Sequence, residues 1–306
     1  MNYKPEGCIL RTAENQKYIS SAEGLAEAME KGVILEARVS VCDSSHNLIV
    51  DLPCGTGIIP RIEGATGIEE GSVRDIALIS RVNKPVCFKV ENIVSDGNGK
   101  VTATLSRRKA QQECMENYIS GLEAGDVIET KVTHLEKFGC FTDIACGIPS
   151  LIPIDSISVS RISHPSDRFH NGQMIKAVVK SNENGRICLT HKELLGTWEE
   201  NAGQFEAGMT VSGIVRSIEN YGIFVELTPN LAGLAELRDN ISVGQNVSVY
   251  IKAVIPEKMK VKLIIVDVCE DCGNTSEIKY FTDAVHIDRW TYSTPQSPKE
   301  TETVFS

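Results

Sequence analysis

Positive charge is scarce in this chain. Its 306 residues carry 31 Lys and Arg against 41 Asp and Glu, which gives a net charge of -10 at pH 7. A deficit of this kind excludes the class of polycations that coat nucleic acids or anionic membranes through bulk charge. Any contact with a polyanion must therefore come from a local patch of basic side chains.

Long hydrophobic runs and catalytic signatures are also lacking. No apolar stretch approaches the roughly 18 residues that cross a bilayer, and the start, Met1 to Glu6, has no apolar signal-peptide core. No GxSxG, P-loop or GxGxxG signature is found. We expect a cytoplasmic protein that has no membrane partner, is not an enzyme and needs no cofactor.

Most of the ten cysteines stand singly inside apolar segments, where a free thiol behaves as a small hydrophobe. One CxxC pair occurs, at Cys269 and Cys272, with His286 as the nearest further ligand candidate. A structural zinc site takes four ligands, and the two acidic residues inside the pair disfavour a reactive thiolate. We therefore predict no metal site, and the sequence leaves the role of the pair open.

The chain does contain an internal repeat. Gly125 opens one copy and Gly208 another, and in each an aromatic-Gly pair begins 13 residues later, at Phe138 and at Tyr221. Each copy holds about five short segments of period-2 alternation separated by Gly turns, which predicts a small closed barrel. The later halves of the two copies also match, at 172–180 with 244–252 and at 186–189 with 260–263.

A third, eroded copy precedes these two, over residues 30–110. It keeps the strand pattern from Gly32 onward, but it has Ser45-His46 where the others have an aromatic-Gly pair. It also carries an extra segment at 64–81. We expect a divergent barrel that has lost the aromatic surface.

Period 3.6 replaces period 2 between the copies, at Ala110 to Leu122 and at Lys192 to Phe205, which predicts linker helices. Ser20 to Glu23 is typical of a capping box for a helix ending near Met29. Residues 291–306 are rich in Ser, Thr, Pro and Glu and are predicted to be unstructured. The expected organisation is an N-terminal segment with a short helix (1–29), a divergent barrel (30–110), a linker helix (111–121), a barrel (122–195), a linker helix (196–203), a barrel (204–268), and an acidic, partly disordered tail (269–306).

The motifs Phe138-Gly139-Cys140-Phe141 and Tyr221-Gly222-Ile223-Phe224, with their flanking pattern, resemble the ribosomal protein S-one RNA-binding domain family. The triplet of copies is similar to the bacterial small-subunit ribosomal proteins S-one. The resemblance implies an all-β chain with short linker helices and three tandem five-stranded OB-type barrels, the first divergent. It also implies single-stranded RNA or mRNA as partner, held by two aromatics, a His, an Asp and an Arg on one face of a barrel.

The family's positions fall on named residues of copies two and three. In copy two the His position holds Pro153, and in copy three it holds Glu236, which would repel a phosphate. Copy two is therefore the best equipped of the three. The RNA-binding candidates are the aromatics Phe138, Phe141, Tyr221 and Phe224, Asn182 at the Asp position, Arg186 and Lys260 at the Arg position, and the neighbouring cations Lys137 and Lys192.

The residue types support this chemistry on physical grounds. Stacking on an aromatic ring gives about 1 to 3 kcal/mol per base with little sequence preference, and a neighbouring cation can hold a phosphate. We expect the intervening Gly to let a base approach closely. Phe138 and Phe141 would face opposite ways on a regular strand, so one is buried unless a bulge at Gly139 turns it. Arg186 and Lys260 could instead be solvated charges, and Asn182 a turn residue.

The function indicated is that of a translation-type RNA-binding protein, with the first barrel as a docking module for the ribosomal small subunit or another protein. Two alternatives stay open. The barrels could form a protein-interaction scaffold that has lost RNA binding, as the missing His and the acidic balance suggest. The chain could also be an accessory subunit of an RNA-decay complex, because fold alone does not separate these functions.

Overall fold

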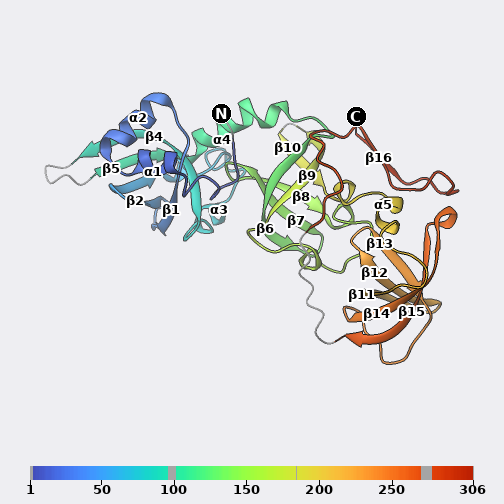
Figure 1. Ribbon diagram of the computed structural model, residues 1–306. Helices are drawn as coiled ribbons and strands as arrows, with labels where there is room; N and C mark the ends of the chain where they lie inside the picture. The colour runs from blue at the N-terminus through green and yellow to red at the C-terminus, as the bar shows by residue number, and fades with distance from the viewer. Residues whose placement is uncertain (1–2, 96–100, 184, 270–277, 306) are drawn as a thin grey trace. The chain divides into compact units, whose positions relative to one another are not determined.

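The computed structural model (Figure 1) describes residues 3–95, 101–183, 185–269 and 278–305. The chain divides into two compact units, residues 1–122 with 143–149 and residues 123–142 with 150–306. The strands close into three five-stranded barrels with the same cyclic order, in which the third strand pairs with the fifth. This confirms the prediction of a mostly-β chain with three OB-type barrels and short helices between them.

The first barrel has the strand order β1-β2-β3-β5-β4. Its interior is filled by alternate apolar residues, with Phe88 and Leu105 fully buried among them. β3 and β5 run parallel, and every other strand pair is antiparallel, as in a Greek-key barrel. The elements are β1 (Leu35–Cys42), β2 (Leu48–Leu52), β3 (Gly55–Ile59), η1 (Arg61–Glu63), α3 (Ile76–Ile79), β4 (Pro85–Ser95) and β5 (Val101–Ser106).

The second and third barrels repeat this order, as β6-β7-β8-β10-β9 and β11-β12-β13-β15-β14. The second has β6 (Val127–Glu136), β7 (Gly139–Ala145), β8 (Ile148–Pro153), η3 (Ile154–Ser156), η4 (Pro165–Asp167), β9 (Met174–Glu183) and β10 (Arg186–Thr190). The third has β11 (Thr210–Glu219), β12 (Gly222–Thr228), β13 (Leu231–Ala235), β14 (Asn246–Ile255), η6 (Pro256–Lys258) and β15 (Lys260–Cys269).

Two helices precede the first barrel, where the sequence predicted one. α1 (Ala13–Ile19) is capped by Thr12 and α2 (Ala22–Lys31) by Ser21, whose side chain accepts a hydrogen bond from the Gly24 amide. The cap is therefore one residue later than expected. α2 ends where Gly32 adopts a left-handed conformation, with φ at +63°.

The linker helices are shorter and more broken than the sequence pattern predicted. α4 (Arg107–Asn117) begins directly after β5 and is followed by η2 (Ile119–Gly121). The expected helix at 192–205 is split into η5 (Lys192–Leu195) and α5 (Trp198–Ala202), because Gly196 has φ at +82°. Thr197 then caps α5 in a capping box with Glu200.

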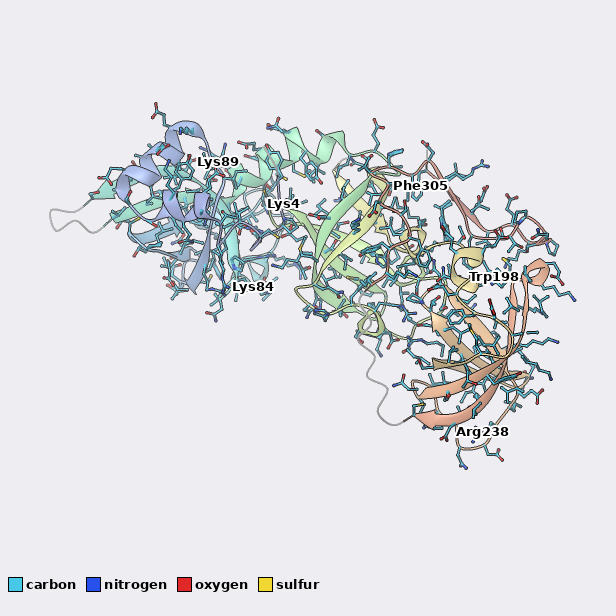
Figure 2. The ribbon with its side chains drawn as sticks, in the orientation of Figure 1. Lys4, Lys84, Lys89, Trp198, Arg238 and Phe305 are labelled. Atoms are coloured by element: carbon cyan, nitrogen blue, oxygen red, sulfur yellow. The ribbon has the colours of Figure 1, made fainter. Side chains whose placement is uncertain are left out.

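The prediction of an unstructured C-terminal segment is wrong for residues 291–305. β16 (Arg289–Thr291) and β17 (Glu302–Val304) form an antiparallel pair, and Trp290, Tyr292 and Phe305 are buried. Trp290 and Tyr292 join the core of the third barrel together with Trp198, while Phe305 packs with Leu194 and Val178. Trp198 and Phe305 are labelled in Figure 2. The segment is ordered because these three aromatic side chains are buried, although its composition is polar.

A buried charge cluster organises the first unit around the N-terminal segment. The Glu6 carboxylate accepts hydrogen bonds from Arg107 Nε at 2.7 Å and Nη2 at 3.1 Å, and it pairs with Arg81 at 3.2 Å. Although burial opposes ionisation, the two guanidinium groups lower the pKa of Glu6. Glu36, also buried, accepts hydrogen bonds from the amides of Gly7 and Ile9.

Candidate nucleic-acid interface

The aromatic pair of the second barrel lies at the start of β7. Phe138 is 57% exposed and Phe141 is half-buried, and their rings meet edge to face at a centroid distance of 5.8 Å. The two rings do not face opposite ways, because Phe138 lies in the turn before β7 while Phe141 lies within the strand. The pair therefore offers an exposed aromatic surface.

The third barrel repeats this arrangement. Tyr221 is 65% exposed, Phe224 is half-buried, and their rings meet edge to face at 6.1 Å. In an edge-to-face pair the two rings do not stack on each other, and the exposed ring of Tyr221 can meet a base. Two barrels of the second unit thus carry the same aromatic geometry on equivalent strands.

The glycine between the aromatics is required for the close packing of two barrel strands and not for contact with a ligand. Gly139 is buried, and a Cβ atom built there would lie 2.5 Å from the backbone oxygen of Ile152 on β8. At Gly222 the corresponding distance, to the backbone oxygen of Ala235 on β13, is 2.6 Å. Our expectation that the glycine admits a base is therefore wrong, because each glycine lets two neighbouring strands approach.

Strand register extends the aromatic pair of the third barrel into a row. Phe224 pairs with Ser217 on β11 and with Leu234 on β13, and Leu234 pairs in parallel with Lys262 on β15. Paired residues point to the same side of a sheet. Lys262 is exposed and therefore points to the same face of the barrel as Phe224, in the same cross-strand row. The sequence alone did not indicate this relation.

Sequence reasoning also missed His134 in the second barrel. Its exposed ring lies nearly parallel to that of Phe141, at 6.5 Å between centroids and 26° between planes, and its Nε2 lies 2.7 Å from the Glu136 carboxylate. The ring extends the aromatic surface onto β6. The available signal was the repeat itself, because His134 lies 83 residues before Ser217, the residue paired with Phe224.

The predicted cations lie in different surroundings. Lys137 is exposed beside Phe138, and Arg186 is exposed at the first position of β10. Lys260 is exposed at the first position of β15. Lys192 lies elsewhere, in η5, where its carbonyl oxygen accepts a hydrogen bond from Asn230 of the third barrel. We therefore place Lys192 at the junction of the two barrels.

Two further positions of the second barrel, Asn182 and Cys188, add no charge to the surface. The Asn182 side chain accepts a hydrogen bond from the Gly185 amide at 3.1 Å, as a turn residue does. Cys188 stands in the second barrel where the third has Lys262, since it pairs with Leu151 as Lys262 pairs with Leu234. Burial raises the pKa of the Cys188 thiol, so this position contributes no charge.

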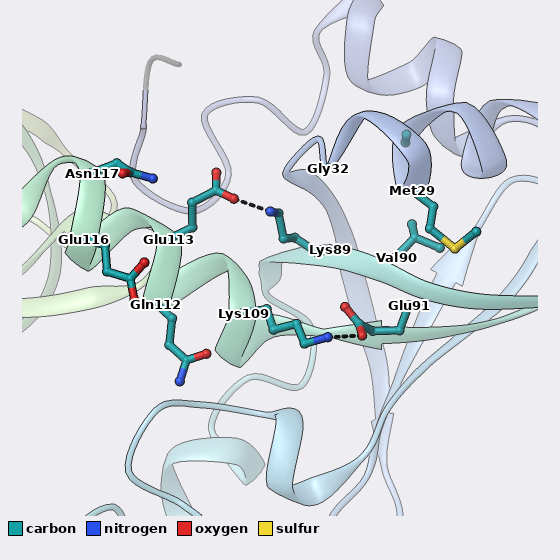
Figure 3. A pocket seen from close by; sticks show the side chains of 11 residues that line it. Met29, Gly32, Lys89, Val90, Glu91, Lys109, Gln112, Glu113, Glu116 and Asn117 are labelled. Atoms are coloured by element: carbon teal, nitrogen blue, oxygen red, sulfur yellow. Dashed lines mark hydrogen bonds and ion pairs between the residues drawn. The ribbon is translucent and has the colours of Figure 1, made fainter.

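The first barrel holds a tight turn where the others hold aromatics. Asp43 accepts hydrogen bonds from the amides of Ser45 and Asn47, and His46 has φ at +61°. The open cavity of this unit, about 500 Å³, lies between α2, β4 and α4 (Figure 3). Its two lysines are engaged, Lys89 with Glu113 and Lys109 with Glu91, so it offers no uncommitted cation to a phosphate.

Other kinds of site are not found in the part of the chain that the structure describes. No group of three or more His, Cys, Asp or Glu there is arranged to hold a metal ion. Cys269 is the last residue of β15, and its CxxC partner Cys272 lies outside the described residues. No helix within the same ranges has the length and apolar character needed to cross a membrane.

Comparison with known proteins agrees with this geometry. Residues 122–192 match the family model of the S1 RNA binding domain. Small ribosomal subunit protein bS1 of Staphylococcus haemolyticus is 28% identical over 270 residues, which cover 83% of this chain and 66% of that protein. The bS1 homolog of Bacillus subtilis is 28% identical over 290 residues, which cover 92% of this chain and 72% of that protein.

Among solved structures, a multidomain protein with nucleic acid binding domains from Streptococcus pneumoniae is 13% identical, with a TM-score of 0.25. That match covers 76% of this chain and 72% of that one. The chain spans about two thirds of the length of the staphylococcal relative. The sequence matches confirm the resemblance inferred from the repeats: residues 122–192 match the S1 RNA-binding domain, and most of the chain is similar to bS1 proteins.

Proposed function

We propose that this bS1-like chain is a non-enzymatic RNA-binding protein of translation, which holds single-stranded RNA or mRNA on its second and third barrels in the cytoplasm. One observation carries the proposal. Two aromatic pairs of one compact unit, one pair in each barrel, place an exposed ring beside a half-buried one at nearly the same ring distance. Exposed rings of this kind suit the stacking of unpaired bases.

The residues that we propose to bind RNA fall into a stacking group, a phosphate-binding group and two residues with other contacts in the fold. Phe138, Phe141, Tyr221 and Phe224 form the stacking surface, and Lys137, Arg186 and Lys260 are placed to meet phosphates. Asn182 and Lys192 are weaker members, because the first closes a turn and the second lies at the barrel junction. Binding at two sites in one unit would raise the overall affinity through effective concentration.

The test is fluorescence anisotropy with a short unstructured RNA over a salt series. We expect wild-type binding that weakens with salt, and a loss of most affinity in Phe138→Ala/Phe141→Ala combined with Tyr221→Ala/Phe224→Ala. The matched control exchanges the two phenylalanines of the second barrel for tyrosine, which preserves a ring for stacking. Absence of wild-type binding at low salt would favour the protein-scaffold alternative.

The first barrel, residues 30–110, is proposed to dock on the ribosomal small subunit. It has no aromatic pair, but its extra segment exposes Ile76 to 65% and Ile79 to 44%. Co-sedimentation with small subunits is expected to fall in Ile76→Asp/Ile79→Asp while RNA affinity is unchanged. Unchanged co-sedimentation would contradict this docking role. Copurification with a nuclease would favour the RNA-decay alternative.

A further inference from the structure

The third barrel carries a group of lysines of which the family motif accounts only for Lys260. Lys252, Lys258, Lys260 and Lys262 are all exposed and all lie on the β14–β15 hairpin, and we call them the lysine strip. None of them forms an ion pair with another residue that the structure describes in 3–95, 101–183, 185–269 or 278–305. The strip therefore concentrates positive charge in a barrel (204–268) whose other charged residues are two arginines and seven carboxylates.

Strand register brings the strip together. Lys260 and Lys262 alternate with the buried Val261 and Leu263, so both point outward from β15. On β14 the register shifts between Ile251 and Ala253, and Ala253 pairs with Lys262. Lys252 is the extra residue of this bulge, and it is exposed next to Lys262.

The strip is continuous with the aromatic surface. Leu234 lies between Phe224 and Lys262 in one cross-strand row over β12, β13 and β15. A nucleic-acid strand whose base stacks on Phe224 would pass its backbone over Leu234 to Lys262. Adjacent phosphates of a single strand are separated by less than about 7 Å, a step that neighbouring strands of a barrel can match.

Two neighbours define the limits of this path. Glu236 is exposed directly after β13, beside the point where Ala235 pairs with Leu263, and its charge opposes a phosphate there. Beyond Lys252, Tyr250 is 38% exposed and pairs with Ile264, which is 40% exposed. The expected path of the RNA backbone therefore follows the cross-strand row as far as Lys262. From there it crosses to Lys252 on β14 and ends at the ring of Tyr250.

Resting on the RNA-binding function proposed above, we propose that the lysine strip is a phosphate track. It would carry the RNA backbone from the Tyr221–Phe224 pair across β15 to Tyr250 on β14. The equivalent row of the second barrel has the neutral Cys188 in place of Lys262. The third barrel, which the sequence ranked second, then supplies the larger share of the salt-dependent binding.

The experiment measures RNA affinity of the full chain over a salt series for Lys252→Gln/Lys262→Gln. Each phosphate contact with single-stranded nucleic acid contributes about 0.7 to the slope of log K against log salt, so we expect the slope to decrease by about 1.4. Lys252→Arg/Lys262→Arg should restore the slope, because it keeps the charge. The matched control, Lys84→Gln/Lys299→Gln, removes two exposed lysines from elsewhere and should leave the slope as in wild type.

The outcomes separate this inference from the function on which it rests. If wild type binds RNA and the aromatic variants lose affinity, but the strip variant keeps the wild-type slope, the phosphate track is wrong and the RNA-binding function stands. If the slope of log K against log salt decreases equally in the strip variant and in the control, the cause is the change in net charge, and the phosphate track is also wrong. If wild type does not bind RNA, both proposals fail.

Discussion

Arg168, in the loop of the second barrel, donates a hydrogen bond to the Glu226 carboxylate on β12 of the third barrel at 2.5 Å. Arg216 of β11 binds the same carboxylate through Nε at 2.8 Å and Nη2 at 3.2 Å. All three side chains are at least nine-tenths buried. Within the second unit, one carboxylate therefore holds two guanidinium groups that belong to different barrels.

Replacement of this carboxylate should destabilise the second unit. In Glu226→Gln two buried guanidinium groups lose their shared counter-charge, and we expect a loss of about 3 to 5 kcal/mol in the free energy of unfolding. Both tryptophans of the chain, Trp198 and Trp290, lie in the core of the third barrel. Urea unfolding followed by tryptophan fluorescence therefore reports on this unit directly.

The control for this substitution is Asp283→Asn in the second unit, which breaks the exposed pair of Lys176 and Asp283. A surface pair of this kind contributes about 0 to 1 kcal/mol, so the variant should resemble wild type. If Glu226→Gln were equally mild, the two barrels would not be coupled through this carboxylate.

The C-terminal segment should behave as part of the folded unit. Trp290 is 7% exposed and packs against Tyr292, whose hydroxyl donates a hydrogen bond to the backbone oxygen of Asn230 at 2.6 Å. Trp290→Ala is expected to cost about 3 to 5 kcal/mol in the free energy of unfolding, measured through the fluorescence of Trp198. Val304→Ala, at a half-exposed position of β17, is the control. Equal stability of the two variants would mean that the segment does not anchor the barrel.

Stability of the first unit should fall as pH rises from about 4.5 to about 8. Burial, followed by the nearby Glu6 charge, raises the pKa of Glu36 to about 8 from the ordinary 4.5. In that window the folded state holds a proton that the unfolded state has lost, so each increase in pH favours unfolding. Glu36→Gln should remove the part of this pH dependence that Glu36 contributes, while Asp143, whose pKa is raised to about 7 by burial and by the Glu6 charge, leaves a smaller one. It should be the more stable form at pH 8, by less than about 5 kcal/mol.

The measurement is amide hydrogen exchange of β1 and α2, compared between wild type and Glu36→Gln at each pH. The comparison at equal pH cancels the intrinsic dependence of exchange on pH. Glu23→Gln, in the first turn of α2, is the control for loss of one carboxylate. Parallel curves for wild type and Glu36→Gln would show that Glu36 is ionised in the folded protein at neutral pH.

The sequence predicted the barrels because each repeat carries its own strand pattern, and fixed spacing located the aromatic pairs. It did not predict Lys262 beside Leu234, because that neighbour depends on the parallel pairing of β13 with β15. The prediction also missed His134. The repeat aligns this residue with Ser217, but its place beside Phe141 depends on cross-strand register. Composition was misleading for the C-terminal segment, where alternation of Trp290 and Tyr292 was the better signal.

Gly139 shows how the barrel fixes the aromatic surface, and this leads to the last prediction. A Cβ atom at this position would lie 2.5 Å from the Ile152 oxygen, which is backbone and cannot rotate away. Gly139→Ala should therefore separate β7 from β8, cost about 1 to 3 kcal/mol in stability and weaken RNA binding by displacing Phe138. Gly121→Ala is the control, because no atom lies within 4 Å of a Cβ atom there.

Thermal unfolding and RNA anisotropy of the two glycine variants distinguish two roles for the aromatic-Gly motif. If Gly139 only admitted a base, its replacement would weaken binding and leave the unfolding temperature unchanged. Because the glycine faces Ile152 inside the barrel and not solvent, we expect both quantities to fall together. The motif then preserves strand packing first, and the exposure of the aromatic ring follows from that packing.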